Sequence, residues 1–237
     1  MEAATIRQAG NGLITGISSM ATRHVLSALA EIYEKRSGQR VAVESVGGVD
    51  AARRVEGGEA FDFVVLAAPA IDRLAAAGRI DPDTRIAIAR SRVAIAVPAG
   101  AQRPDLASEQ TVRTAVLAAH RIGYSTGPSG EHLAKLLLRW GIADAIASRL
   151  VKAPPGVPVG TLVARGEADI GLQQLSELID LPGVDVVGTL PPDIQEITVF
   201  TGAVCASSIR RSAAEALLSF YASPEADAAK RRYGMEP

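Results

Sequence analysis

The sequence RIGYSTGPSGEHLAKLLLRW, residues 121–140, carries the clearest structural pattern in the chain. Its first four residues can end a short strand, and leucines recur at helical spacing in its second half. The loop between them, residues 125–130, holds two glycines and three hydroxyls, and Ser129 is expected to cap the helix. Unpaired backbone N–H groups at the positive end of a helix attract anions, so we predict an anion site here. An ordinary strand-to-helix turn shares this pattern, but the chain uses the device twice.

Strands and helices alternate along most of the chain. Strands are expected at residues 12–17, 40–46, 61–66, 93–97, 121–124, 150–152, 170–173, 184–187 and 197–206. Helices are expected at residues 50–56, 69–77, 112–119, 159–164 and 175–181, with one more ending at Gly38 and two at the C-terminal end. Residues 61–66 are almost wholly apolar, as is typical of a buried parallel strand. The order predicts an α/β fold with mostly parallel sheets.

Two pieces of this order resemble one another. Gly58-Glu59-Ala60 and Gly166-Glu167-Ala168 each precede a strand and a helix, and Ser18-Ser19 and Ser125-Thr126 each lie between a strand and a helix. We therefore predict two lobes, each a mixed, mostly parallel sheet flanked by helices. Lobe 1 is expected to comprise residues 1–96 and 201–237, and lobe 2 residues 97–200. Two crossover hinge strands, at residues 94–97 and 197–203, would join them.

Composition excludes several classes of function. The 237 residues are 48% hydrophobic and carry a formal net charge of -1 without a run of like charges, which argues against nucleic acid or an anionic membrane as a partner. No apolar run reaches the length of a membrane span. The single cysteine, Cys205, allows no intrachain disulfide and no cysteine-rich metal site, and we expect it to be a small buried residue.

The first dozen residues contain Glu2, Arg7 and Gln8 and no uninterrupted hydrophobic region, so no signal peptide is expected. As given, the chain is expected to be cytoplasmic. A chain from which a leader had been removed would have the same sequence and would be periplasmic.

The predicted ligand site is the cleft between the lobes, because ligands of open α/β sheets bind at the carboxyl ends of the strands. The candidate ligand-binding residues are Ser18, Ser19, Gly47, Gly48, Ser125, Thr126, Ser129, Gly130, Gln173, Gln174 and Ser176. They are hydroxyls, amides and glycines, and none carries a fixed charge. Such donors suit an oxyanion or a small carboxylate. Gln173 and Gln174 should point to opposite faces of their strand, so one of the two is expected to contact the ligand.

Other motifs of cofactor and metal chemistry are missing from the sequence. It contains no metal-ligand spacing, no Walker loop, no dinucleotide-binding glycine turn and no hydrolase triad motif. We therefore expect no cofactor and no metal. Ser129 in Gly127-Pro128-Ser129-Gly130 lacks the spacing of a nucleophile elbow and is not expected to act as a nucleophile.

The order of these motifs resembles a known family. Ser18-Ser19 before a helix, Gly47-Gly48 before a second helix, the sequence GGEAFDFVVLAA, the sequence GPSG and the closing Tyr233-Gly234-Met235 look like type II periplasmic binding proteins of the molybdate-binding, ModA-like branch. Typical members carry hydroxyl residues where this chain has Gly47-Gly48-Val49. The combination of GPSG with QQLSEL looks more like a divergent branch that includes aconitate isomerase.

The resemblance implies two lobes that close on a ligand by hinge motion, with oxyanion contacts from Ser18, Ser19, Gly47 and Gly48. An exported member would hand its ligand to an ABC permease.

Three functions remain open at this point. The first is a solute-binding protein for a small oxyanion or carboxylate. The second is a cytoplasmic isomerase of a small unsaturated polycarboxylate, which needs a base in the cleft; the candidates are His24, Glu131, His132 and Glu177, and the sequence assigns the role to none of them. The third, an effector-sensing domain, ranks last because the sequence shows no helix-turn-helix segment.

Overall fold

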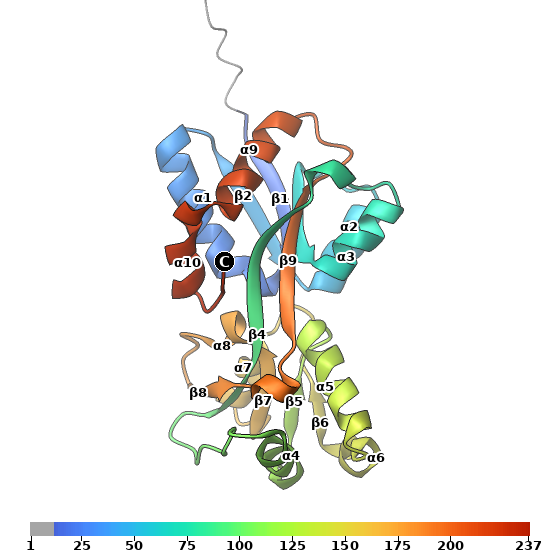
Figure 1. Cartoon of the computed structure of the whole chain (residues 1–237), viewed down its shortest axis with the longest axis vertical. Helices are drawn as coiled ribbons and strands as arrows, with labels where there is room; N and C mark the ends of the chain where they lie inside the picture. The colour runs from blue at the N-terminus through green and yellow to red at the C-terminus, as the bar shows by residue number, and fades with distance from the viewer. Residues whose placement is uncertain (1–11) are drawn as a thin grey trace, which may run out of the picture.

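The computed structural model describes residues 12–237, so the signal-peptide prediction, which rests on residues 1–11, lies outside the described residues. The molecule is elongated, and two α/β lobes stacked along its long axis are joined by strands β4 and β9 (Figure 1). Lobe 1 contains β1 (Ile14–Ser19), α1 (Arg23–Ser37), β2 (Val41–Val46), α2 (Gly48–Glu56), β3 (Phe63–Ala67), α3 (Ala68–Ala76), α9 (Arg211–Ala222) and α10 (Asp227–Arg232). Its sheet runs β2-β1-β3-β9-β4, with β1 parallel to β2 and β3 and antiparallel pairing from β9 onward.

Lobe 2 has the same plan. It contains α4 (Glu109–Ala118), β5 (Ile122–Tyr124), α5 (Pro128–Arg139), α6 (Ala143–Ile146), β6 (Leu150–Lys152), α7 (Val159–Ala164), β7 (Ile170–Gln174), α8 (Leu175–Leu178) and β8 (Val184–Thr189). Strands β7, β5 and β6 are parallel, whereas β4 pairs antiparallel with both β7 and β8. The α/β class and the mixed sheets with flanking helices expected from the sequence are confirmed, with parallel and antiparallel strand pairs in equal number among the described residues.

The two lobes are connected by one long and one shorter strand, β4 (Ile86–Pro98) and β9 (Ile197–Val204). From Ile86 to Arg92, β4 pairs with β9, and from Val93 onward it pairs with β7 and β8 (Figure 1). The first seven residues of β4 were not expected to be a strand, because two arginines and a serine interrupt the apolar pattern there. In the folded protein, pairing with β9 stabilises the extended conformation of these seven residues. The exact lobe limits, residues 96 and 200, stay a prediction.

Each lobe has its own apolar core. In lobe 1, Phe63, Phe200 and Tyr221 are buried between the sheet and the helices α1 and α9. In lobe 2, the leucines of α5 at helical spacing, Leu133 and Leu136 among them, pack against β5 and β7. Because each sheet is covered separately, the lobes can move as bodies about β4 and β9.

Two element boundaries differ from the expectation for identifiable reasons. Strand β3 starts at Phe63 because the buried residue before it, Asp62, is held by side-chain contacts outside the strand. Its carboxylate accepts hydrogen bonds from Thr15 N at 2.9 Å and from Ser208 Oγ at 2.7 Å. Helix α8 ends at Leu178 rather than at residue 181, since Asp180 adopts a left-handed φ of 59° that a helix cannot contain.

Cys205 is buried, as expected, and burial raises the pKa of its thiol to about 12. Across residues 12–237, the helices are too short or too polar to cross a bilayer. In the same range, no group of three or more histidine, cysteine, aspartate or glutamate side chains is arranged to hold a metal ion.

Candidate anion site between the lobes

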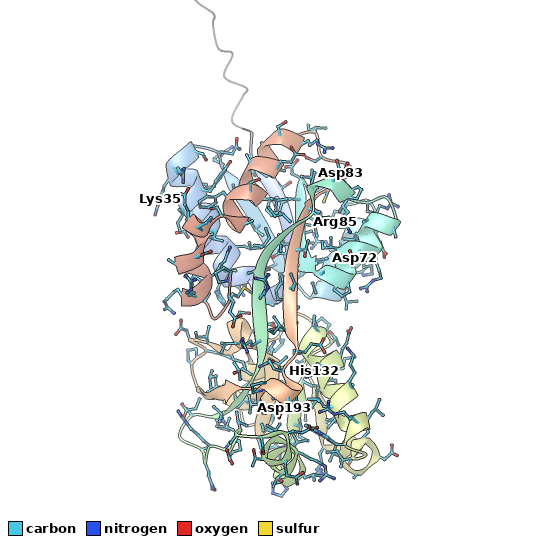
Figure 2. All side chains as sticks on the ribbon, in the orientation of Figure 1. Lys35, Asp72, Asp83, Arg85, His132 and Asp193 are labelled. Atoms are coloured by element: carbon cyan, nitrogen blue, oxygen red, sulfur yellow. The ribbon has the colours of Figure 1, made fainter. Side chains whose placement is uncertain are left out.

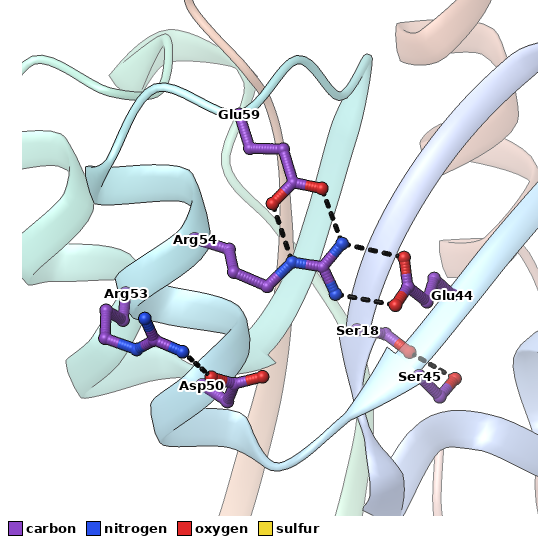
Figure 3. Close-up of polar contacts among 7 residues, drawn as sticks. All are labelled: Ser18, Glu44, Ser45, Asp50, Arg53, Arg54 and Glu59. Atoms are coloured by element: carbon purple, nitrogen blue, oxygen red, sulfur yellow. Dashed lines mark hydrogen bonds and ion pairs between the residues drawn. The ribbon is translucent and has the colours of Figure 1, made fainter.

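The two neighbouring serines at the end of β1 have different surroundings. Ser18 is fully buried, and its hydroxyl lies 2.9 Å from Ser45 Oγ, which ties β1 to β2 (Figure 3). Ser19 precedes the short 3-10 turn η1 (Met20–Thr22), and its Oγ is buried without a hydrogen-bond partner among the described residues. A buried hydroxyl without a partner is costly, so Ser19 is the serine of this pair whose hydrogen-bonding capacity remains for a ligand.

The second loop of lobe 1 lies against Ser19. Gly47 is the residue before α2, and Gly48 is its first residue. A Cβ added at Gly48 would lie 3.6 Å from Ser19 Cβ, and one added at Gly47 would meet nothing within 4 Å. The glycines therefore leave the first N–H groups of a nine-residue helix uncovered next to the Ser19 hydroxyl, as an anion site requires.

The charged side chains around α2 are ion-paired. Arg54 donates to Glu44 at 2.6 Å and to Glu59 at 2.5 and 2.7 Å, and Arg53 pairs with Asp50 (Figure 3). The Arg54 guanidinium lowers the pKa of both glutamates that it contacts. Because these carboxylates are held by cations, they do not face the N-terminus of α2 as free negative charges.

In lobe 2, the loop from Ser125 to Gly130 forms the equivalent device, with one correction. The residue that caps α5 is Gly127 and not Ser129, because Pro128 occupies the first helical position, where its missing N–H costs nothing. Ser129 is buried in the first turn, and its Oγ lies 3.1 Å from Ser125 Oγ. A Cβ on Gly130 would lie 1.7 Å from the Ser125 carbonyl oxygen, so only glycine fits there. Thr126 is exposed on the outside of the loop.

Gln173 and Gln174 at the end of β7 are both buried but point in opposite directions. The Gln173 carboxamide accepts from Val159 N at 2.7 Å and donates to Glu177 Oε1 at 2.8 Å. The Gln174 amide donates to Thr198 Oγ1 at 2.8 Å, on the connecting strand β9, and its carbonyl oxygen has no hydrogen-bond partner within residues 12–237. Both hydrogen-bond partners of Gln173 therefore lie within lobe 2, whereas Gln174 links lobe 2 to the connecting strand β9.

Ser176 of lobe 2 lies next to the Ser19 loop of lobe 1. It lies in α8, which packs against η1 directly after Ser19. Like Ser19, it has a buried Oγ that finds no partner in the part of the chain that the structure describes. Two buried hydroxyls on opposite lobes therefore remain unpaired at adjoining elements.

A cavity of about 840 Å³ adjoins this set. Met20, Ser45 and Gly47 of lobe 1 line it, as do Pro155 and Gly156 of lobe 2, so it opens at the junction of the lobes. Its wall also includes Arg23 and His24 at the start of α1, with acidic residues of α1, β2 and α2 farther along. Arg23 was not among the residues expected in the site. The one sequence feature that could have indicated Arg23 is its position, because a basic residue at the start of the helix that follows Ser19 lies near the predicted anion site.

The structure separates the four candidate bases. His24 is exposed and stacks on Tyr233 with 6.2 Å between ring centroids, and Glu131 is exposed in the first turn of α5. His132 lies beside the segment that leads into β9: its Nε2 is 2.7 Å from Ile194 O and its Nδ1 is 2.8 Å from Glu196 Oε2 (Figure 2). Nε2 is thus engaged by the backbone at the hinge, whereas Nδ1 lies within ion-pair distance of Glu196 without a hydrogen bond among the described residues.

Glu177 differs from these three. It is half-buried in α8, and burial raises the pKa of its carboxyl group to about 7, while the hydrogen bond from Gln173 acts in the opposite direction. The site thus contains one carboxyl group that can take up and release a proton near neutral pH.

The raised pKa makes stability depend on pH. Between pH 4.5 and pH 7 the folded protein holds a proton on Glu177 that the unfolded chain releases, so the stability from this group is present at low pH and is lost as the pH rises through 7. Glutamine is neutral at every pH. We expect Glu177→Gln to raise the thermal midpoint by about 4 °C at pH 8.5 and to leave it unchanged at pH 4. Scanning calorimetry of both proteins at both pH values measures this; an equal shift at both would contradict it.

Comparison with known proteins supports the resemblance seen in the sequence. The family model for bacterial extracellular solute-binding proteins matches residues 14–236. An aconitate isomerase of Pseudomonas sp is 34% identical over 229 residues, which cover 94% of this chain and 87% of that protein. The molybdate-binding protein ModA of Escherichia coli (strain K12) is 25% identical over 235 residues, covering 95% and 90%.

Solved structures show the same fold. The periplasmic molybdate-binding protein of Azotobacter vinelandii superposes with a TM-score of 0.79 at 20% identity and covers 94% of this chain and 99% of its own. The sulfate-binding protein SubI from Mycobacterium tuberculosis H37Rv gives 0.78 at 20% identity, covering 95% and 86%. The predicted two-lobed type II periplasmic-binding-protein fold is confirmed. By its sequence and its fold, this chain belongs to the bacterial extracellular solute-binding proteins, in a divergent branch similar to ModA.

Proposed function

We propose that this protein captures a small organic carboxylate between its lobes by hinge closure. One observation carries the proposal: the hydroxyls of Ser19 and Ser176, on opposite lobes, are buried and unpaired where η1 and α8 meet. Each unpaired buried hydroxyl costs about 1–3 kcal/mol, and an acceptor bound between them would remove that cost. A ligand held in this way favours the closed form by its contacts with both lobes.

The chemistry around these hydroxyls selects an anion. The N-terminus of α2 at Gly47 is uncovered beside Ser19. In lobe 2, the start of α5 contains Gly130 and Ser129, whose hydroxyl lies 3.1 Å from Ser125 Oγ. Helix N-termini and hydroxyls donate hydrogen bonds to negative oxygens. The adjoining cavity of about 840 Å³ has room for the rest of an organic acid; Arg23 and His24 at the start of α1 are the basic residues of its wall, and the acidic residues of the wall lie on α1, β2 and α2.

A second candidate function is the isomerisation of a small unsaturated polycarboxylate in the same cleft. Glu177, with a pKa near 7, favours it, because a binding protein needs no group that exchanges a proton at neutral pH. The 34% identity to an aconitate isomerase along nearly the whole chain supports the same candidate.

Partner and location follow from which candidate holds. An exported form would deliver its ligand to an ABC permease, and an isomerase would act on its own in the cytoplasm. Fractionation of cells that carry the native gene tests this part of the proposal.

A thermal-shift series tests the capture of a carboxylate. We expect citrate, cis-aconitate and trans-aconitate to raise the unfolding midpoint, and molybdate, tungstate and sulfate to leave it unchanged. A ligand present at 100 times its Kd stabilises the folded state by about 2.7 kcal/mol, which is several degrees for a chain of this size. Sodium chloride at matched ionic strength is the control. A shift with molybdate or tungstate alone would mean that the ligand is an inorganic oxyanion and not a carboxylate. No shift at all would contradict the proposal.

A further inference from the structure

We infer that Glu177 is a catalytic residue, the base that carries a proton from one end to the other of an allylic polycarboxylate bound between the lobes. This inference rests on the isomerase candidate above and assigns its chemistry to one residue, with Gln173 as the positioning residue.

The orientation of Gln173 is fixed by the backbone. Val159 N is a hydrogen-bond donor only, and it lies 2.7 Å from Gln173 Oε1, which fixes the carbonyl end of the amide at the N-terminus of α7. The amide nitrogen then points at Glu177 and donates to its Oε1 at 2.8 Å. Because an NH₂ group can only donate, it holds the carboxylate oxygen as an acceptor in one position.

The rest of the Glu177 carboxylate carries no compensating contact. Within residues 12–237, no cation pairs with it, and Gln173 is its one hydrogen-bond partner. A carboxylate that serves only to stabilise the fold would be expected to have an arginine or lysine beside it, as Glu44 and Glu59 have in lobe 1. The second oxygen of Glu177 is therefore available to a substrate proton.

Glu177 is placed with the anion-binding groups. It follows Ser176, whose unpaired hydroxyl belongs to the proposed site, and both are in the four-residue helix α8 that contacts η1. Its partner Gln173 bonds the first residue of α7, close in sequence to Pro155 and Gly156, which line the cavity at the junction of the lobes.

Desolvation tunes this carboxyl group for the task. A glutamate in water is a weak base, whereas burial raises the pKa of Glu177 to about 7. A base is most effective when its pKa lies near the working pH. A large fraction of the base is then deprotonated, and its affinity for a proton is still high.

The proposed reaction conserves protons and electrons. The Glu177 carboxylate takes a proton from the methylene carbon between a carboxylate and the double bond; the C–H electron pair moves into the allylic system, which becomes a dienolate. The carboxyl group then returns the proton to the far carbon of the allylic system, so the double bond has moved by one position and the enzyme is unchanged. Hydroxyls of Ser19 and Ser176 would stabilise the charge that develops on the substrate carboxylate.

Proton exchange in deuterated water tests the inference. We expect the wild-type protein to form cis-aconitate from trans-aconitate in deuterated water, with deuterium entering the methylene position in those turnovers in which the Glu177 proton exchanges with solvent before its return; both are followed by proton NMR. Glu177→Gln should bind trans-aconitate within about twofold of the wild-type Kd and lose exchange and isomerisation by at least about 100-fold. The matched control is Glu56→Gln, an exposed glutamate at the end of α2, which should retain full activity.

The outcomes separate the inference from the function on which it rests. If the wild-type protein binds trans-aconitate but neither exchanges nor isomerises it, the catalytic role is overturned and capture stands. If it isomerises and Glu177→Gln does so equally well, another base acts. If it does not bind trans-aconitate or the other carboxylates, the proposed function itself fails.

Gln173 provides an independent test. In Gln173→Leu the donor to Glu177 is lost, and since that hydrogen bond lowers the pKa of Glu177, its removal should raise it. We expect the acidic limb of the pH–kcat profile, on which the rate rises as Glu177 loses its proton, to move to higher pH by a measurable amount, with partial rescue in Gln173→Asn. A profile that keeps its limb near pH 7 while only the stability falls would leave Gln173 a structural residue and overturn its role.

Discussion

Replacing Ser19 with leucine is expected to abolish ligand binding, by at least about 100-fold in Kd, without unfolding the protein. The Ser19 side chain is buried where lobe 1 meets α8, and Gly48 lies close enough for an added Cβ to be 3.6 Å from Ser19 Cβ. Leucine removes the free hydroxyl and fills the space in which an anion would lie, so the lobes can no longer close on a ligand. Isothermal titration with the ligand found by thermal shift measures the loss, and circular dichroism checks the fold.

The neighbouring serine provides the matched control. Ser18→Ala removes the hydrogen bond to Ser45 at 2.9 Å, which should cost about 1 kcal/mol of stability, and it should leave the Kd unchanged because that hydroxyl is already engaged. The sequence assigned both serines to the ligand. A loss of binding in Ser18→Ala equal to that in Ser19→Leu would show that the hydrogen-bond pattern of the free protein does not identify the ligand contact.

Gly16→Ala is expected to destabilise the protein by about 3 kcal/mol or more. Gly16 is in the middle of β1, between β2 and β3. A Cβ built there would lie 2.2 to 2.6 Å from three atoms of the Phe63 ring. Phe63 is fully buried in the core of lobe 1 and cannot move without displacing its neighbours. Urea unfolding followed by circular dichroism measures the change.

A second strand glycine serves as the control for Gly16. Gly188 lies in β8, and a Cβ there would meet only Leu106 Cδ1 at 3.6 Å, an ordinary van der Waals contact. Gly188→Ala should change the free energy of unfolding by less than about 1 kcal/mol in either direction. Equal losses in the two variants would mean that the cost comes from the strand backbone and not from the Phe63 ring.

The proposed catalytic step suggests how little separates a receptor from an enzyme on this fold. The unpaired hydroxyls and helix N-termini that hold an anion also stabilise the negative charge that proton abstraction creates. One carboxyl group with a pKa near 7 beside them is the only addition that the proposed reaction needs. In the proposed isomerase, capture and catalysis would use the same contacts.

Much of the fold could be predicted from the sequence because the relevant information is local. Apolar spacing located α5 and the buried strand β3 to within two residues, and glycine and serine placed the strand-to-helix loops that carry the site. The family resemblance followed from the order of these motifs. Where the pattern was mixed, as in the first half of β4, only pairing with β9 makes a strand.

The tertiary structure alone decided which polar groups are free to act. Ser18 and Ser19 are adjacent and chemically identical, but Ser45, on another strand, satisfies the first and leaves the second unpaired. Glu177 and Glu131 are both glutamates in the first turn of a helix, but Glu131 is exposed, whereas burial raises the pKa of Glu177 to about 7. Hydrogen-bond partners and desolvation come from residues that are distant in sequence, so no local pattern encodes them.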